Sequence, residues 1–186
     1  MNSIKVIGAG LIGTSIALGA KRAGLTVELL DADLRAANLA NDLVFSEPVD
    51  DPDLVVIATP SSALRGILEE FRNQYVNCTF IDIGSTKTKV AVDIQSFPEL
   101  VNRFCPTHPM AGRELNGAEA AQSDLFSGRT WVVTPLEETG DLAVQRAKEL
   151  IVLLGATSVQ MSVEEHDAAV ATVSHLPQII SSLLAC

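Results

Sequence analysis

Three glycines near the start of the chain constrain its fold more than any other feature. Gly8, Gly10 and Gly13 form a G-x-G-x-x-G pattern directly after the apolar, β-forming residues 4–7. A helical stretch follows and ends at Gly24, and a second apolar run over residues 27–30 leads into Asp31. Strand, glycine turn, helix, strand and acid in this order are typical of a βαβ unit that binds a dinucleotide. A glycine-rich turn in another kind of α/β protein is the alternative.

Each part of this pattern has a task at a bound pyrophosphate. Gly8 permits a tight turn, Gly10 lets the backbone approach the phosphates, and Gly13 lets the helix pack closely on the strand. The helix N-terminus supplies free N–H groups and a partial positive charge. Asp31 is expected to accept hydrogen bonds from both ribose hydroxyls and to repel a 2′-phosphate. The sequence therefore predicts NAD, rather than NADP, as the cofactor.

Composition limits the partners of the chain. The 186 residues carry a formal net charge of −10, which argues against nucleic acid and anionic membranes as partners. An anionic substrate would therefore need a locally positive pocket. Cys78, Cys105 and Cys186 show no metal-ligand spacing, so we expect reduced thiols and no metal site. No apolar run approaches membrane-spanning length and the chain opens directly on a strand, which predicts a cytoplasmic protein.

Strands and helices alternate along the chain, which predicts a Rossmann-type, doubly wound and mainly parallel sheet. Further strands are expected over 53–58, 78–83, 103–108, 130–134 and 157–161, and helices over 34–43, 64–71, 86–95 and 141–154. Residues 1–161 are predicted to form an NAD-binding domain. Ser162 and Glu165 form a capping box that opens another helix. We interpret 162–186, which is apolar to its end, as the first helix of a truncated helical domain for substrate binding and dimerisation.

Three of the predicted strands end in residues suited to a ligand site. Ligands of such sheets bind beyond the carboxyl ends of the strands, so residues 59–60, 84–85 and 108–109 are expected to converge on the nicotinamide. The long connection over residues 110–128 follows the third of these strand ends and is expected to be functional. The predicted cofactor-binding residues are Gly8, Gly10, Leu11, Ile12, Gly13, Asp31, Thr59 and Pro60.

His108 is the candidate general base. Oxidation of an alcohol by NAD needs a proton acceptor at the oxygen, and imidazole titrates near neutral pH. A structural histidine at the strand end is the alternative. Ser85 is expected to hydrogen-bond the same hydroxyl or the histidine, or else to cap the following helix. His166 lies nine positions before His175, about half a turn away on an ideal helix, and is interpreted as a structural or surface residue.

Positive and polar side chains are candidates for the substrate side of the site. Arg113, Lys87 and Arg129 can each offer positive charge to a carboxylate, although a solvated surface position is the alternative for each. His175 and Gln178 lie three positions apart, so one helical face can carry both.

Six motifs, taken in order, resemble those of the prephenate/arogenate dehydrogenases of tyrosine biosynthesis. They are G-A-G-L-I-G (8–13), T-P (59–60), D-I-G-S-T-K (82–87), H-P-M-A-G (108–112), L-F-S-G-R (125–129) and S-H-L-P (174–177). The resemblance runs from about residue 4 to the last residue. It implies oxidative decarboxylation of an anionic cyclohexadienol, in which hydride passes from the ring carbon bearing the hydroxyl to NAD and the ring carboxylate leaves as carbon dioxide.

The resemblance also implies roles for individual residues. His108 matches the histidine that accepts the ring hydroxyl proton, Ser85 the serine that helps to position it, and His175 a histidine of the substrate pocket. Gln178 stands where many members that use prephenate have a second histidine, so prephenate and arogenate remain alternatives. Arg113 replaces a small polar residue and is expected either to pair with a substrate carboxylate or to face solvent.

The sequence is consistent with three functions. The first is the dehydrogenase. The second is a non-catalytic NAD-binding fragment, because members of the family continue into a helical region that forms the dimer and contributes an arginine for the ring carboxylate. The third is a related reductase that acts on a hydroxy or imino acid, against which the H-P-M-A-G motif argues. A homodimer is expected, formed through the C-terminal helix or the missing helical region.

Overall fold

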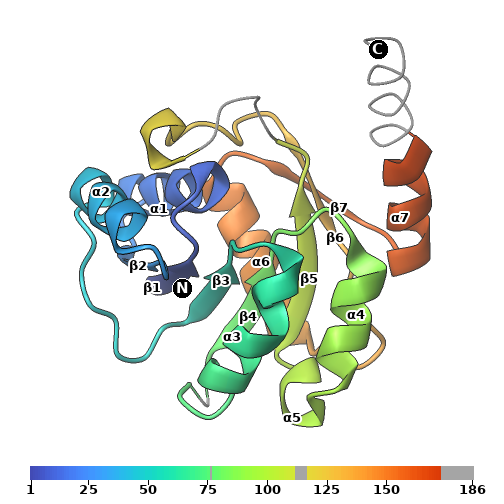
Figure 1. Cartoon of the computed structure of the whole chain (residues 1–186). Helices are drawn as coiled ribbons and strands as arrows, with labels where there is room; N and C mark the ends of the chain where they lie inside the picture. The colour runs from blue at the N-terminus through green and yellow to red at the C-terminus, as the bar shows by residue number, and fades with distance from the viewer. Residues whose placement is uncertain (76, 112–116, 173–186) are drawn as a thin grey trace, which may run out of the picture.

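Seven strands form one sheet in the order β2-β1-β3-β4-β5-β6-β7 (Figure 1). The computed structural model describes residues 1–75, 77–111 and 117–172, and the structural statements below concern these residues. Neighbouring strands are parallel, except that β5 and β6 are antiparallel. The prediction of a doubly wound, mainly parallel sheet is confirmed.

The observed elements follow the predicted ones within one or two residues at most ends. The strands are β1 (Ser3–Ile7), β2 (Thr26–Leu30), β3 (Leu54–Ile57), β4 (Thr79–Asp82), β5 (Phe104–Pro109), β6 (Thr130–Val133) and β7 (Thr157–Gln160). The α-helices are α1 (Leu11–Arg22), α2 (Leu34–Val44), α3 (Leu64–Phe71), α4 (Lys87–Gln95), α5 (Pro98–Val101), α6 (Asp141–Leu153) and α7 (Val163–Val170). The short α5 and the 3-10 turns η1 (Ser61–Ala63) and η2 (Ala118–Ala120) were not predicted.

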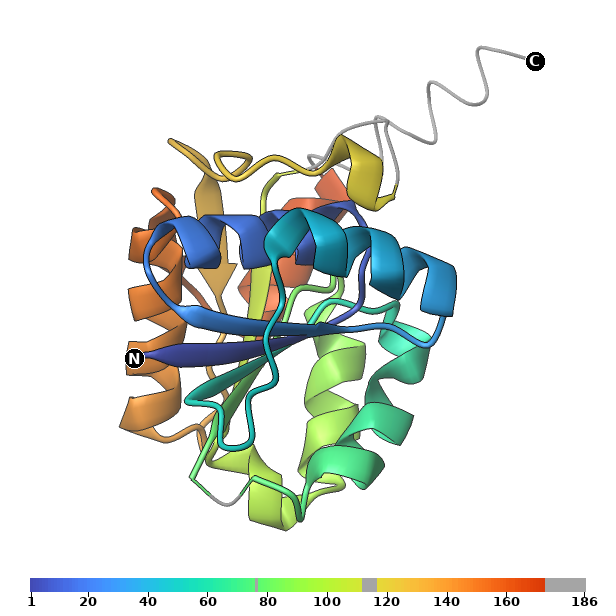
Figure 2. The same cartoon turned by 90° about the vertical axis from the view of Figure 1, so that its left-hand side faces the viewer.

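Alternation along β3 divides the hydrophobic core into two layers. Leu54 and Val56 belong to the cluster that α1, α2 and α6 cover, whereas Val55 and Ile57 belong to the cluster under α3, α4 and α5. Successive side chains of a strand point to opposite faces of a sheet, so a strand buried on both faces must be apolar throughout. Figure 2 shows α1 and α2 on the opposite side of the sheet from α3 and α4.

The layered order places a crevice beside the first strand. β1 pairs with β2 on one side and with β3 on the other, and the helices that follow these strands cover opposite faces. The connections therefore diverge at the carboxyl ends of β1 and β3. In open α/β sheets this switch point is the ordinary place for a ligand.

The antiparallel pairing of β5 with β6 brings two distant segments to this edge of the sheet. His108 pairs in register with Val132, and the N–H of Met110 donates to the carbonyl of Thr130 at 2.8 Å. The start of β6, with Arg129 directly before it, therefore lies beside the end of β5.

Helix α7 begins at the predicted capping box. The Ser162 hydroxyl accepts from the N–H of Glu165, and the Glu165 carboxylate accepts from the N–H of Ser162. This helix packs on α4. The continuation of the predicted helix over residues 173–186 lies outside the described residues.

Replacement of Gly13 by alanine is expected to destabilise the fold. A Cβ at this position would lie 2.0 Å from the carbonyl oxygen of Gly8 and 2.9 Å from the Cβ of Ala58. Forcing α1 away from β1 should lower the free energy of unfolding by about 1–3 kcal/mol, measured by urea denaturation. Gly66→Ala in α3 is the control, because its Cβ would meet nothing within 4 Å and should stabilise the helix by about 1 kcal/mol. Equal stability of G13A and the parent chain would contradict the expectation.

Candidate functional site

A cavity of about 700 Å³ lies at the switch point, beyond the carboxyl ends of the first three strands. Its lining residues are Ile7, Gly8, Gly10, Leu30, Asp31, Ala32, Ala58, Thr59, Pro60, Ala63, Ile67, Glu70 and Phe71. Five of the eight residues predicted to bind the cofactor are among them.

The glycine turn forms one wall of this cavity. Gly8 has φ +117°, and a Cβ there would lie 2.5 Å from the carbonyl oxygen of Ala58, so the turn accepts only glycine. A Cβ on Gly10 would meet nothing within 4 Å, which means that its open side faces free space. Helix α1 begins at the next residue and has no side-chain cap. The N–H groups of its first turn are therefore available to an anion.

Asp31, at the end of β2, holds the glycine turn by a hydrogen bond. Its carboxylate accepts from the N–H of Ala9 at 2.6 Å and from the N–H of Asp33 at 2.8 Å. A carboxylate has about four acceptor sites, so Asp31 retains capacity for ligand hydroxyls.

One buried polar atom of the cavity wall also fits a polar ligand. Thr59 Oγ1 is buried and has no hydrogen-bond partner among the described residues. Three features of the site together match the polar groups of a dinucleotide. They are the uncapped N–H groups of α1, the acid at the end of β2 and the unpaired hydroxyl at the end of β3.

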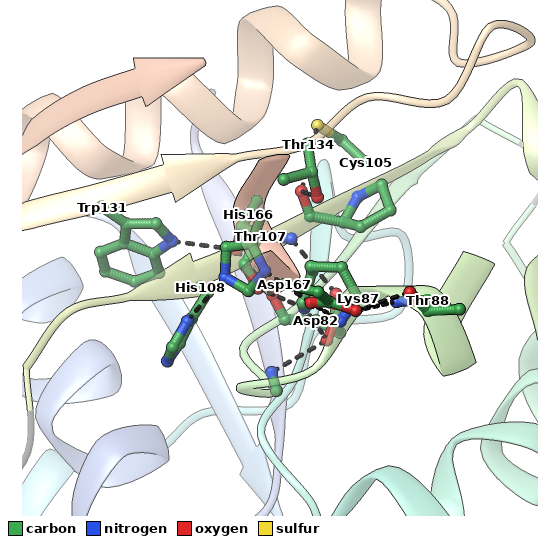
Figure 3. Close-up of polar contacts among 12 residues, drawn as sticks. Asp82, Lys87, Thr88, Cys105, Thr107, His108, Trp131, Thr134, His166 and Asp167 are labelled. Carbon is green, nitrogen blue, oxygen red and sulfur yellow. Dashed lines mark hydrogen bonds and ion pairs between the residues drawn. The ribbon is translucent and has the colours of Figure 1, made fainter. Parts of the chain in front are cut away.

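A second polar cluster holds the ends of β4 and β5 (Figure 3). The Asp82 carboxylate accepts from Lys87 Nζ at 2.5 Å, from the N–H of Gly84 at 2.9 Å and from the N–H of Thr107 at 3.2 Å. Lys87 Nζ also donates to the carbonyl of Thr107 at 2.6 Å. The Thr107 hydroxyl donates to the carbonyl of Asp82 and accepts from the Trp131 indole. These bonds fix the backbone immediately before His108.

The burial of Lys87 corrects its predicted role. Its side chain is 0% exposed, so it is neither a solvated surface charge nor turned toward the open edge. Burial lowers the pKa of the Lys87 ammonium, and the negative charge of Asp82 opposes this shift. Lys87 therefore pairs with the Asp82 carboxylate and holds the backbone of β5.

His108 contacts a second histidine that comes from α7. Its Nδ1 lies 2.9 Å from Nε2 of His166, and Nδ1 of His166 lies 2.8 Å from the Asp167 carboxylate. His166 is 1% exposed. Of its two interpretations, as a structural or a surface residue, the surface one is wrong, because α7 places the side chain against His108 at the end of β5. Sequence reasoning compared His166 only with His175 on its own helix, and no local signal points to a partner 58 positions away.

Asp167 caps α4 from outside that helix. It accepts from the N–H groups of Lys87 and Thr88, each at 2.9 Å, and from the Thr88 hydroxyl at 2.6 Å. The N-cap residue itself is Thr86, without a side-chain cap, and Ser85 is exposed in the preceding turn. The alternative interpretation of Ser85 as the helix cap is therefore wrong.

These bonds change the acidity of Asp167. Partial burial alone would raise the pKa of the carboxyl, but the hydrogen bonds from Thr88, Lys87 and His166 outweigh it and hold the pKa well below its usual range. Asp167 is therefore ionised at neutral pH.

The remaining candidates lie in several places. Arg129 is exposed directly before β6, at the same edge as His108. Arg113, His175, Gln178 and Cys186 lie outside the described residues.

The described residues contain neither a metal-binding cluster nor a helix that could span a membrane. Across residues 1–75, 77–111 and 117–172, no group of three or more His, Cys, Asp or Glu side chains is placed to hold a metal ion. In the same part of the chain, no helix has the length and hydropathy to cross a membrane.

Comparison with known proteins agrees with this geometry. Residues 15–160 match the family model described as "Prephenate dehydrogenase, nucleotide-binding domain". The chain belongs to the prephenate dehydrogenase family. The family predicted from the motifs is thus confirmed.

Individual members of the family are similar over nearly the whole chain. A prephenate dehydrogenase of Bacillus subtilis is 32% identical over 195 residues, which cover 98% of this chain and 53% of that protein. The structure of prephenate dehydrogenase from Aquifex aeolicus in complex with hydroxyphenyl propionate and NAD+ is 27% identical and has a TM-score of 0.91, covering 100% of this chain and 68% of that one. The structure of Synechocystis arogenate dehydrogenase is 26% identical with a TM-score of 0.87, covering 98% and 68%. The chain spans about half the length of the curated relatives it matches.

Asp167→Asn is expected to destabilise the fold in a pH-dependent way. The folded pKa lies below the unfolded value of about 3.9, so the carboxylate stabilises the fold fully above that value and loses its effect as pH falls toward the folded pKa. Thermal or urea unfolding should show a deficit of about 1–3 kcal/mol for D167N at pH 7 that shrinks as the pH falls below about 4. Asp124→Asn, at an exposed position, is the control. A deficit independent of pH would contradict the assignment.

Proposed function

We propose that this chain is the NAD-binding part of an enzyme that oxidatively decarboxylates prephenate or arogenate. The observation that carries the proposal is the position of His108 at the end of β5, on the same edge of the sheet as the glycine turn, in a member of the prephenate dehydrogenase family. Proton acceptor and cofactor site then flank one reaction centre.

NAD is the proposed cofactor. Gly8, Gly10, Leu11, Ile12, Gly13, Asp31, Thr59 and Pro60 would hold it. When bound, the nicotinamide ring supplies an acceptor for hydride. The chain contributes the uncapped N-terminus of α1 for the phosphates and the Asp31 carboxylate for the ribose.

His108 is the proposed proton acceptor. A neutral imidazole can take the proton of the ring hydroxyl while hydride leaves the ring carbon that bears this hydroxyl. The bond to the ring carboxylate then breaks, carbon dioxide departs and the electron pair of that bond moves into the ring, which becomes aromatic. The ring oxygen takes the resulting negative charge and regains the proton from His108. Ser85, exposed in the turn after β4, is proposed to orient the hydroxyl and the imidazole.

The substrate side is proposed from residues beyond the described ones. Arg113 would pair with a substrate carboxylate, and His175 and Gln178 would contact the side chain of the cyclohexadienol. The anionic substrate needs such local charge because the chain has a formal net charge of −10. We also propose that residues from 162 onward begin a helical domain that completes the pocket and forms a homodimer.

Replacement of His108 by asparagine is expected to lower turnover by about 100-fold or more, because a general base contributes about 10²–10⁴ to the rate. The affinity for NAD should change by less than about twofold. Both are measured on the 186-residue chain, by absorbance at the NADH band with prephenate and arogenate side by side and by titration with NAD. Unchanged turnover of H108N would contradict the role of the histidine.

The length of the chain relative to its curated relatives favours one alternative, an NAD-binding fragment without activity of its own. It predicts that NAD raises the melting temperature while neither substrate is oxidised. That pair of results would replace the dehydrogenase proposal for the isolated chain.

Asp31→Ser is expected to weaken the preference for NAD over NADP by about tenfold, since it removes a negative charge beside the position of a 2′-phosphate. The ratio of the two dissociation constants is measured by calorimetric titration. Asp42→Ser, on the exposed side of α2, serves as the matched control and should leave the ratio unchanged. Equal affinity of the parent chain for both cofactors would contradict the assignment of Asp31.

A further inference from the structure

The two histidines and Asp167 form a continuous chain of hydrogen bonds, which has a single direction when both imidazoles are neutral. Asp167 is the end of the chain, and an ionised carboxylate only accepts hydrogen bonds. Nδ1 of His166, 2.8 Å away, must therefore carry a proton. In a neutral His166 the other ring nitrogen, Nε2, is then an acceptor.

The direction passes on to His108. Its Nδ1 lies 2.9 Å from the accepting Nε2 of His166, so Nδ1 of His108 carries the proton of that bond. In the neutral imidazole, Nε2 of His108 then holds the lone pair. In this neutral pair the tautomer of His108 therefore follows from a carboxylate that it does not touch.

Asp167 is itself held in place by a different element. Three donors at the start of α4, the N–H groups of Lys87 and Thr88 and the Thr88 hydroxyl, bind its carboxylate. The same Lys87 reaches through its Nζ to the carbonyl of Thr107, the residue before His108. Both ends of the chain of bonds are therefore anchored to one helix terminus.

We propose that His166 and Asp167 are positioning residues for His108: they hold its imidazole in the Nδ1–H tautomer, with Nε2 as the proton-accepting atom. This inference rests on the proposed function for its catalytic consequence. It means that α7, which follows the last strand of the sheet, supplies part of the proton-accepting apparatus. It also gives a role to the buried imidazole of His166 on α7.

The arrangement also serves the product of proton transfer. When Nε2 of His108 takes a proton, Nδ1–H remains the donor to His166, and the carboxylate beyond stabilises the positive charge that appears. Both effects favour transfer, since an orienting carboxylate behind a histidine secures the tautomer and the imidazolium together.

Histidine tautomers test the inference without reference to activity. Two-dimensional ¹H–¹⁵N spectra of the ring nitrogens of the 186-residue chain should show His108 as the Nδ1–H tautomer. In His166→Phe, which keeps a ring but removes the acceptor, His108 should shift toward the Nε2–H tautomer. In His166→Gln, whose amide oxygen can accept from His108 and whose NH₂ can donate to Asp167, it should remain Nδ1–H. An unchanged tautomer in H166F would overturn the proposal.

Kinetics test the catalytic consequence with the same variants. H166F should lower kcat about 100-fold with KM and the dissociation constant of NAD within about twofold, and H166Q should recover most of the loss. Val170→Ala, a buried change elsewhere on α7, controls for loosening of the helix and should leave kcat within about twofold. Equal kcat losses in H166F, H166Q and V170A would indicate a merely structural role and overturn the inference.

The two proposals fail separately. A parent chain that shows the Nδ1–H tautomer, and loses it in H166F, but oxidises neither prephenate nor arogenate would contradict the proposed activity and support the positioning pair. A parent chain that is active and whose His108 keeps its tautomer in H166F would support the activity and contradict the pair.

Discussion

The buried ion pair between Asp82 and Lys87 is the interaction on which the rest of the site depends. Two charges are removed from water, which is tolerated only because further hydrogen bonds satisfy them. Those additional bonds run to the N–H of Gly84 in the turn after β4 and to the N–H and the carbonyl of Thr107. The pair therefore joins β4, α4 and β5 at the point where Ser85 and His108 emerge. Loss of either partner would leave an uncompensated charge in the interior.

The helices α1 and α4 both begin at the same edge of the sheet, but the N–H groups of their first turns have different surroundings. The first turn of α1 has no side-chain cap and begins directly after Gly10, which lines the 700 Å³ cavity, so its N–H groups are available to the proposed pyrophosphate. The first turn of α4 is neutralised by Asp167, which arrives from α7. The N-terminus of α1 is therefore available to an anionic ligand. The N-terminus of α4 instead holds Asp167, the carboxylate that is hydrogen-bonded to His166. The two helix N-termini differ because Asp167 binds the first turn of α4.

Much of the fold was predictable because its signals are local. The glycine spacing, the buried apolar strands and the capping box at Ser162 each reside in a few consecutive residues, and the structure contains all three. The burial of Lys87 and the contact of His166 with His108 were not predicted, for the opposite reason. Both depend on elements that meet only after the sheet has formed, and a single charged or imidazole side chain carries no periodic signal of its own. Helical spacing placed His166 relative to its own helix and not relative to β5.

The sequence by itself determined the cofactor half of this protein: a βαβ unit, the turn that requires glycine at position 8, an acid at the end of β2 and the alternation of strands and helices along the chain. These follow from backbone sterics and from the periodicity of buried residues, which act between near neighbours in the chain. Only the tertiary structure decided what surrounds His108. Residues 82, 108 and 167 come from three elements, and their hydrogen bonds exist because the sheet brings two strand ends together and α7 packs on the start of α4. Such long-range contacts arise from packing, which no local pattern encodes.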